Sequence, residues 1–194
     1  MSERLRLGVI IGSVRKGRSG TIVADWFAAE ARKSDQFEVE LIDLADFHLP
    51  LPFGEGMTAE ELAQIRPLTQ ALHEADAYVV VTPEYNHSYP AGLKNAIDWH
   101  GKEWEAKPVA FVSYGGISGG LRAVEHLRTV LAELHAVTIR ATVSFVNYWD
   151  QFDGEGRWPK EPETGNSAAK GLLQQLAWWA QALKEAKAKE PYPG

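Results

Sequence analysis

The stretch LRLGVIIGSVRKGRSGT, residues 5–21, contains a strand, a loop and the start of a helix. Leu5 to Ile11 is apolar at most positions, which is typical of a parallel strand that is buried on both faces. A helix is expected from Gly20 to Arg32, because apolar residues recur there at helical spacing. A strand that leads through a short loop into a helix is the opening half of a βαβ unit, so the stretch predicts a parallel sheet.

The rest of the chain repeats this alternation. Further strands are expected at Phe37–Leu44, Ala77–Thr82, Pro108–Tyr114 and Val137–Val146, and further helices at Thr58–Ala75, Ala91–Glu103, Gly120–Leu134 and Ser167–Lys187. Pro67 is expected to split the second helix into two short ones. Trp149 to Asn166 reads as a long polar loop, and AKAKEPYPG, residues 186–194, reads as a frayed, solvated end.

Five strands with intervening helices predict an α/β fold with a parallel sheet. Right-handed crossovers leave two simple arrangements, the flavodoxin-like strand order 2-1-3-4-5 and a half-Rossmann sheet. A second domain, an internal repeat or a low-complexity segment is not evident. A single domain over residues 1–194 is therefore expected, and this length is enough to bury one sizeable core.

The composition is that of an ordinary soluble globular protein, with 45% hydrophobic and 24% charged residues. The net charge of −6 argues against nucleic acid or an anionic membrane as the main partner. The chain has no cysteine, which excludes disulfides, thiolate nucleophiles and zinc–thiolate sites. Its apolar runs are shorter than the roughly 20 residues that span a bilayer. A cytoplasmic location is expected.

The loop after the first strand is expected to bind a phosphate. Gly12, Gly17 and Ser19 keep the spacing of a nucleotide-triphosphate loop, but Arg18 stands where that pattern requires Lys. Arg and Lys are not interchangeable at such a position, so the loop better suits a phosphate monoester. Its hydroxyl groups, its cations such as Arg15 and the following helix N-terminus all favour an anion. The alternative is a solvated basic turn.

Two further loops are expected at the same edge of the sheet, because ligands of open α/β sheets bind beyond the carboxyl ends of the strands. Tyr85, Asn86 and Tyr89 follow the third strand, and aromatic rings with amides suit a flat heterocycle with polar edges. A structural turn capped by Asn86 or Ser88 is the alternative. The loop SYGGISGGLRA, residues 113–123, has glycines that let the backbone approach a ligand closely.

Together these loops carry a resemblance. The spacing GSxRxxxS after the first strand, PEYNxSxPxxLKNxxDW after the third and SxGGxxGGxRA after the fourth resembles the NADPH-dependent FMN reductase family. That family includes flavodoxin-like quinone, azo-dye and chromate reductases, and the likeness runs from about residue 5 to residue 146. It implies a flavodoxin-like three-layer sandwich with sheet order 2-1-3-4-5 and FMN bound across the three loops.

The resemblance also implies which residues contact FMN. The residues that it assigns to FMN are Ser13, Arg15, Ser19, Gly20 and Thr21 at the phosphate, Pro83, Glu84, Tyr85 and Asn86 along the isoalloxazine, and Ser113, Gly115 and Gly116 at its pyrimidine end. Many members of the family have Asn at the position of Gly20. Neither a catalytic side chain nor a metal site is predicted, and His87 is expected at the rim of the site.

The activity that the resemblance implies is that of an oxidoreductase. Hydride from NADPH or NADH reduces FMN, and two electrons then pass to a quinone, an azo compound, free flavin or a metal oxyanion. The alternatives are a flavodoxin-type FMN carrier without nicotinamide activity and a flavin-free interaction module. Carriers tend to be strongly acidic, so the modest charge and the cations Arg15, Lys16 and Arg18 favour the reductase.

A homodimer or a dimer of dimers is expected, with the active site near the interface. The helix after the third strand carries Leu93, Ile97, Trp99 and Trp104, which is more apolar surface than one buried face requires. Closed two-fold symmetry is the usual arrangement of such assemblies, and the resemblance implies that a partner chain helps to wall the pocket. The alternative is that the two tryptophans pack against the sheet or against the polar loop.

Overall fold

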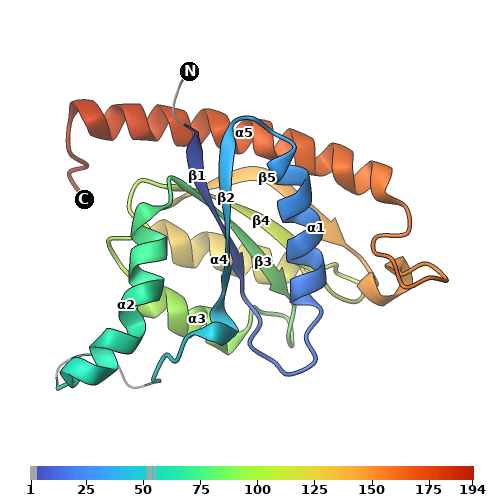
Figure 1. The fold of residues 1–194 in the computed structure, drawn as a ribbon, viewed down its shortest axis with the longest axis horizontal. Coiled ribbons are helices and arrows are strands. Elements are labelled where there is room, and N and C mark those ends of the chain that lie inside the picture. Colours follow the sequence, from blue (N-terminus) through green and yellow to red (C-terminus); the bar gives the residue numbers. More distant parts are fainter. Residues whose placement is uncertain (1–3, 52–53, 55) are drawn as a thin grey trace.

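The computed structural model describes residues 4–51, 54 and 56–194, and its centre is a parallel sheet with the strand order β2-β1-β3-β4-β5 (Figure 1). The strands are β1 (Leu5–Ile11), β2 (Phe37–Asp43), β3 (Ala77–Pro83), β4 (Pro108–Tyr114) and β5 (Val137–Phe145). The helices are α1 (Gly20–Arg32), α2 (Ala59–Glu74), α3 (Ala91–Asp98), α4 (Leu121–Glu133) and α5 (Pro162–Lys189), with short 3₁₀ turns η1 (Leu44–Asp46) and η2 (Tyr148–Gln151). The strand order confirms the flavodoxin-like arrangement over the half-Rossmann one.

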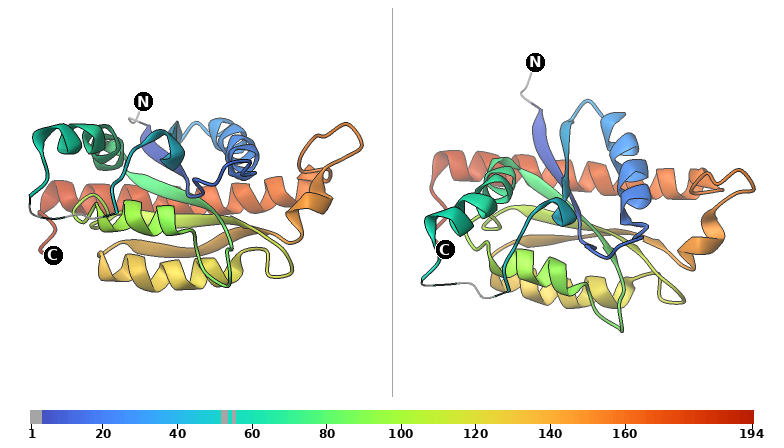
Figure 2. Two further views of the ribbon diagram at one scale, coloured as in Figure 1. Left: turned by 90° about the horizontal axis from the view of Figure 1, so that it is seen from below. Right: turned by 60° about the horizontal axis from the view of Figure 1, so that its bottom comes forward.

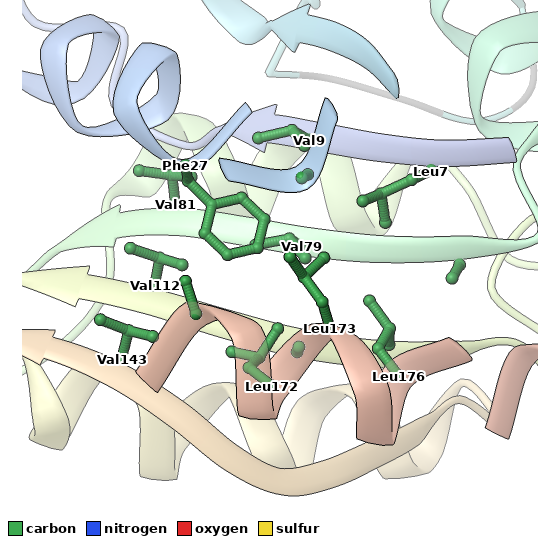
Figure 3. Close-up of a cluster of buried hydrophobic side chains, with 14 of the residues drawn as sticks. Leu7, Val9, Phe27, Val79, Val81, Val112, Val143, Leu172, Leu173 and Leu176 are labelled. Atoms are coloured by element: carbon green, nitrogen blue, oxygen red, sulfur yellow. The ribbon is translucent and has the colours of Figure 1, made fainter. Parts of the chain in front are cut away.

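Helices cover both faces of the sheet, as Figure 2 shows. Every residue of β3 and β4 is buried, which explains why their sequences are apolar almost throughout. On one face, Phe27 of α1 and Leu172 and Leu176 of α5 pack onto the strands (Figure 3). On the other face, α2, α3 and α4 cover the sheet with Leu68, Leu93, Leu127 and their neighbours. The expected three-layer sandwich is therefore confirmed.

The prediction that Pro67 splits the second helix is wrong, because α2 runs unbroken through it. Proline leaves the carbonyl four residues earlier, that of Ala63, without its helical donor. Both residues lie on the exposed side of α2, where water can reach that carbonyl. A capping box between Thr58 and Glu61 fixes the start of the helix, and buried Leu68 holds it to the sheet.

Other boundaries differ where tertiary contacts decide them. Helix α3 ends at Asp98 instead of Glu103, and the chain then turns so that Trp104 is buried under the sheet. Helix α5 begins at Pro162 instead of Ser167, since proline is well placed in a first helical turn. The polar segment from residue 149 is accordingly shorter than expected. Helix α5 ends at Lys189, two residues later than expected, and the remaining strand and helix ends agree with expectation to within one residue.

The C-terminal residues are more ordered than the sequence suggested. Residues 186–189 continue α5, so the prediction of a frayed end is wrong for them. Beyond the helix, the Tyr192 hydroxyl lies 2.9 Å from the His135 Nδ1 atom. In the part of the chain that the structure describes, no helix is both long enough and apolar enough to cross a membrane, and this includes the 28-residue α5.

A buried lysine holds the end of α2. Lys107 immediately precedes β4, and its Nζ donates to the carbonyl oxygens of Leu72 (2.7 Å) and His73 (2.9 Å) and to the Tyr78 hydroxyl (3.1 Å). The two carbonyls belong to the last turn of α2, where they have no helical donor. Burial, together with the charge of Lys187, lowers the pKa of Lys107 to about 8.

This lowered pKa predicts how stability changes with pH. The unfolded chain keeps the Lys107 proton up to about pH 10.5 and the folded chain releases it near pH 8. Between these values the unfolded state binds more protons, so the free energy of unfolding rises with pH. Relative to a Lys107→Met variant, the natural protein should gain about 2 kcal/mol between pH 7 and pH 9.5. Urea unfolding at several pH values measures this difference, with Lys170→Met on exposed α5 surface as the control. An equal pH dependence in the natural protein and the Lys107 variant would contradict the prediction.

Candidate functional site

The loops after β1, β3 and β4 leave the sheet at one edge, and the segment after β5 joins them there (Figure 1). Between them is a cleft of about 260 Å³. Its lining consists of Arg15, Gly17, Arg18, Ser19, Pro83, Glu84, Tyr85, Tyr114, Gly115, Gly116, Tyr148 and Trp149. A hollow of about 540 Å³ lies along α1 and α5, but only the smaller cleft lies at the carboxyl ends of the strands, where ligands of such sheets bind.

Two polar residues of the first loop hold the loop itself. The Ser13 hydroxyl is fully buried and shares a 2.8 Å hydrogen bond with the Tyr85 hydroxyl, which ties the first loop to the second. Arg18 pairs with the Asp43 carboxylate at the carboxyl end of β2. A sequence pattern could not indicate that a carboxylate reaches this loop, because Asp43 is distant along the chain. The Arg18 charge is therefore largely neutralised within the fold.

The cations that remain on this loop are Arg15 and Lys16. Both side chains are exposed, and neither forms an ion pair with a carboxylate of the described residues. They precede the N-terminus of α1, where Ser19 is the N-cap residue but makes no side-chain cap. The Ser19 hydroxyl instead donates to the Tyr148 hydroxyl at 3.2 Å. The first-turn amides of α1 thus have no capping side chain, and the end of the helix favours an anion.

The second loop is a tight two-residue turn. Tyr85 and Ser88 exchange both backbone hydrogen bonds, at 2.8 and 3.1 Å. The two residues between them, Asn86 and His87, have φ values of 50° and 68°. Such positive values at both positions define a type I′ turn, in which Asn is a preferred residue. Asn86 and His87 are exposed on the turn and do not line the cleft.

A buried carboxylate joins the second loop to the third. Glu84 accepts hydrogen bonds from the Ser118 hydroxyl (2.6 Å), the Arg122 guanidinium (2.8 Å) and the Arg122 backbone N–H (3.2 Å). Burial acts to raise the pKa of Glu84, but these donors outweigh it, and the pKa lies below its ordinary value. The negative charge also sits at the N-terminus of α4, where the helix dipole favours it. Glu84 therefore positions the loops.

The third loop bends back over the end of β4. Gly119 and Gly120 both have positive φ, and a side chain at Gly120 would collide with the backbone of Tyr114. The Gly119 carbonyl accepts hydrogen bonds from the buried Ser113 hydroxyl (2.8 Å) and from Ser144 (2.9 Å). The Ser113 hydroxyl is thus used within the loop and does not face the cleft.

The third loop also presents backbone to the cleft. Gly115 and Gly116 both line it, and the Gly115 N–H donates to the Phe145 carbonyl at 3.2 Å. For the Gly116 N–H no backbone acceptor is recorded among the described residues. Of the two amides, Gly116 is therefore the one that can donate to a ligand.

Three aromatic residues of the cleft were missed in the sequence. Tyr114 ends β4, and Tyr148 and Trp149 follow β5. The Tyr114 and Tyr148 rings meet edge to face with centroids 5.2 Å apart, and Trp149 is more than half exposed. Ligands bind at the carboxyl ends of strands, and this rule applies equally to β5. The aromatic pair Tyr148–Trp149, shortly after the end of β5, could therefore have been predicted to line the cleft.

The predicted site residues thus divide into two groups. Arg15, Ser19, Pro83, Glu84, Tyr85, Gly115 and Gly116 line the cleft, whereas Ser13, Gly20, Thr21, Asn86 and Ser113 do not. The second group lies directly beside the first and shapes it. The described residues contain no cluster of His, Asp and Glu side chains that could hold a metal ion.

Comparison with known proteins identifies the family. The model of the NADPH-dependent FMN reductase family matches residues 5–150. The chain belongs to this family. It is 34% identical over 191 residues to a quinone reductase of Escherichia coli strain K12, and the match covers 95% of this chain and 96% of that protein. To an NADPH azoreductase of Bacillus sp. strain OY1-2 it is 36% identical over 137 residues, which are 70% of this chain and 73% of that protein.

The fold comparison agrees with the family. The flavoenzyme NAD(P)H:(acceptor) oxidoreductase FerB from Paracoccus denitrificans superposes with a TM-score of 0.73 at 22% identity, over 92% of this chain and 98% of that one. At this identity the likeness concerns the fold alone. As an FMN reductase by family, the chain is an oxidoreductase with FMN as its cofactor and NAD(P)H as its co-substrate.

The cleft fits FMN on its own chemistry. A phosphate monoester needs cations and hydrogen-bond donors, and the cleft has Arg15 and Ser19 beside a helix N-terminus. A flat ring system needs apolar contact and close backbone, and Pro83 and Gly116 provide these. The Tyr114 hydroxyl is buried and has no hydrogen-bond partner among the described residues. A buried polar group of this kind normally has a partner.

The Glu84 contacts predict a loss of stability when its charge is removed. A Glu84→Gln variant keeps the size of the side chain but turns an amide N–H₂ group toward donors of Ser118 or Arg122. We expect a loss of about 2–3 kcal/mol in the free energy of unfolding at pH 7, because a buried acceptor and an ion pair are lost together. Chemical unfolding measures it, with exposed Glu163→Gln as the control.

The same comparison has a pH dependence. The Glu84 pKa is lowered in the folded state, so its ionised form stabilises the protein above its ordinary pKa of 4.5. This stabilisation is lost as the pH falls through the folded-state value. The stability difference between the natural protein and Glu84→Gln should therefore shrink on acidification. A difference that is small at pH 7, or that grows in acid, would show that Glu84 does not hold the loops.

Proposed function

We propose that residues 1–194 form one FMN-binding domain that transfers electrons from NADPH or NADH to a small acceptor such as a quinone or an azo compound. The observation that carries this is the convergence of three family loops, with their phosphate-type and ring-type chemistry, on one cleft at the carboxyl edge of the sheet. The names of the relatives, quinone reductase and NADPH azoreductase, support this acceptor class. Bound FMN supplies the chemistry of accepting hydride and passing on electrons.

The chain itself positions the cofactor and the substrates. Arg15 and Ser19, with the free amides of α1, would hold the phosphate, and Lys16 adds positive charge at the same end. Pro83, Tyr85 and Gly115 would line the isoalloxazine, and the Gly116 N–H is free to donate to its pyrimidine end. Donors fixed before binding cost little reorganisation when negative charge develops on a ligand.

The open side of the cleft suits a flat acceptor. Trp149 packs beside Gly116 and is 54% exposed, so its ring presents an apolar face to solvent at the mouth of the cleft. Quinones and azo dyes are planar and aromatic, and such molecules stack on exposed indole rings. The charged residues that line the cleft are not suited to proton transfer: Glu84 and Arg18 are engaged in ion pairs, and the guanidinium of Arg15 does not give up its proton.

The flavodoxin-type carrier is not favoured. Curated relatives that align along most of the chain are reductases with a nicotinamide co-substrate or a quinone acceptor in their names. The exposed cations Arg15 and Lys16 lie at the cleft, where they can also meet the phosphates of a nicotinamide cofactor. The hypothesis of a flavin-free interaction module does not explain why the three loops carry the residues that they do.

Steady-state kinetics test the proposed activity. Without air, the FMN-loaded protein should turn over NADPH or NADH repeatedly only when an acceptor such as benzoquinone is present. Nicotinamide and quinone need the same face of the cleft, so they should bind in turn and give parallel double-reciprocal lines, as in a ping-pong mechanism. The control is the same protein without FMN, which should be inactive. Tight FMN binding with negligible nicotinamide oxidation would instead establish the carrier.

We further propose that the protein works in the cytoplasm as a homodimer or a dimer of dimers. The sequence analysis expected Leu93, Ile97, Trp99 and Trp104 to form the contact between chains, and the structure corrects this. Leu93, Ile97 and Trp104 are buried within the chain, and Trp99 donates its Nε1–H to the Pro50 carbonyl. The alternative, in which Trp104 packs against the sheet, is therefore the correct one for that residue.

A different apolar surface supports the assembly. The exposed apolar residues beside the cleft are Ile117, Leu121, Val146 and Trp149. They come from the loop after β4, the first residue of α4 and the segment after β5, and Val146 lies beside Gly119 of that loop. Ile117 is 85% exposed. Apolar and aromatic side chains gathered on one surface are typical of protein contacts.

Light scattering at micromolar concentration tests the assembly. We expect a mass near 43 kDa, twice the 21.5 kDa of one chain, or a further doubling. An Ile117→Asp variant should shift the protein toward the monomer, because a carboxylate would be buried in the contact. Exposed Ile22→Asp on α1 is the control. A fully active natural protein that remains at 21.5 kDa would contradict the proposal.

A further inference from the structure

The Tyr114 hydroxyl is a buried polar group of the cleft that has no hydrogen-bond partner in the described part of the fold. Among the described side chains that line the cleft, the Arg18 Nε is the other such atom, and the Arg18 guanidinium is already paired with Asp43. The Tyr114 side chain is 3% exposed, and its hydroxyl has no hydrogen-bond partner among the described residues. By contrast, the hydroxyls of Tyr85 and Tyr148 are bonded to Ser13 and Ser19. A buried hydroxyl without a partner costs free energy, and such groups are uncommon enough in native structures that each calls for an explanation.

The position of this hydroxyl is set by contacts on both sides. A Cβ atom placed on Gly20 would lie 2.9 Å from the Tyr114 oxygen, so the hydroxyl abuts the first residue of α1. The Tyr148 ring lies edge to face against the Tyr114 ring and limits its movement. The hydroxyl is thus held at the N-terminus of α1, the end at which Ser19 provides no side-chain cap.

The chemistry of this position is that of a hydrogen-bond donor to an anion. Burial raises the pKa of Tyr114 well above its ordinary value, so the hydroxyl keeps its proton at neutral pH. The first-turn amides of α1 point the positive end of the helix dipole toward the same place. Arg15 on the adjoining loop adds a full positive charge. A donor, a helix end and a cation together suit a phosphate monoester.

We propose that the Tyr114 hydroxyl donates a hydrogen bond to the phosphate of FMN, and that Tyr114 thereby selects FMN over flavins without a phosphate. The proposal rests on the proposed FMN site. It also explains why position 20 is glycine in this chain: the space that a side chain at the start of α1 would occupy is filled by the tyrosine from β4. The donor comes from the sheet instead of from the helix.

Binding of FMN and of riboflavin to the apoprotein tests this directly. Riboflavin lacks the phosphate, so a Tyr114→Phe variant should bind FMN about tenfold or more weakly and riboflavin about as well as the natural protein does. Fluorescence quenching of each flavin gives both dissociation constants. Arg15→Ala should likewise weaken the binding of FMN but not that of riboflavin. The control is Tyr192→Phe, which removes a tyrosine hydroxyl far from the cleft and should bind both flavins as the natural protein does.

The stability of the apoprotein supplies a second readout. The hydroxyl has no partner in the fold, so Tyr114→Phe should melt at the same temperature as the natural apoprotein or higher. Gly20→Ala, which forces the hydroxyl to move without removing it, should also weaken FMN more than riboflavin. A lowered melting temperature for Tyr114→Phe with unchanged flavin selectivity would make Tyr114 structural and overturn the proposal.

The other outcomes separate the possible errors. Equal weakening of FMN and riboflavin would place the hydroxyl at the ring or the ribityl chain and overturn the assignment to the phosphate. Unchanged FMN binding with a raised KM for NADPH but not NADH would assign the hydroxyl to the nicotinamide cofactor, which also overturns it. Failure of the natural protein to bind FMN would instead overturn the proposed function, on which this inference depends.

Discussion

A parallel sheet has to be covered on both faces, and this constraint organises the whole molecule. Each strand returns to the same edge through a crossover, so the helices must lie over the faces and the loops must gather at the ends. Strands β3 and β4 lie inside the sheet and are buried at every position, so neither strand has a face that is exposed to solvent. The polar groups that can meet a ligand therefore lie at the carboxyl ends of the strands and in the loops that follow them. The cleft lies at the carboxyl edge because the buried strands leave it no other place.

Most polar groups around the cleft hold one loop to another. Ser13 binds Tyr85, Glu84 binds Arg122, and Ser113 binds the Gly119 carbonyl. The first two contacts join segments that are distant along the chain, and the third fixes the loop after β4 on itself, so the loops are held in place before any ligand arrives. Rigid positioning of this kind lowers the entropy cost of binding. The groups left over, chiefly Arg15, the Gly116 N–H and the Tyr114 hydroxyl, are those with which the cleft can bind a ligand.

The sequence predicted the fold well because apolar runs and helical periodicity are local signals. It failed at Pro67, where an exposed carbonyl and a strong N-cap kept α2 intact, and at the end of α3, where burial of Trp104 turned the chain. The location of the site was predictable from the strand ends. The roles of individual residues were less so, because the Arg18–Asp43 pair and the Ser13–Tyr85 bond join segments that only the folded chain brings together. Tyr114 is the last residue of β4, as predicted, but the sequence could not indicate that its hydroxyl is buried without a hydrogen-bond partner.

Helix α5 has a consequence for how the chain folds during its synthesis. It is made after all five strands, and it lies across one face of the sheet, where Leu172, Leu173 and Leu176 cover residues of the strands (Figure 3). Until α5 leaves the ribosome, α1 alone among the described helices covers that face, and part of the apolar surface of the nascent sheet stays open to water. Such surface attracts chaperones and aggregates with other chains. A message cut short before residue 162 would thus yield a chain with every strand and every flavin loop, yet without the means to stay soluble.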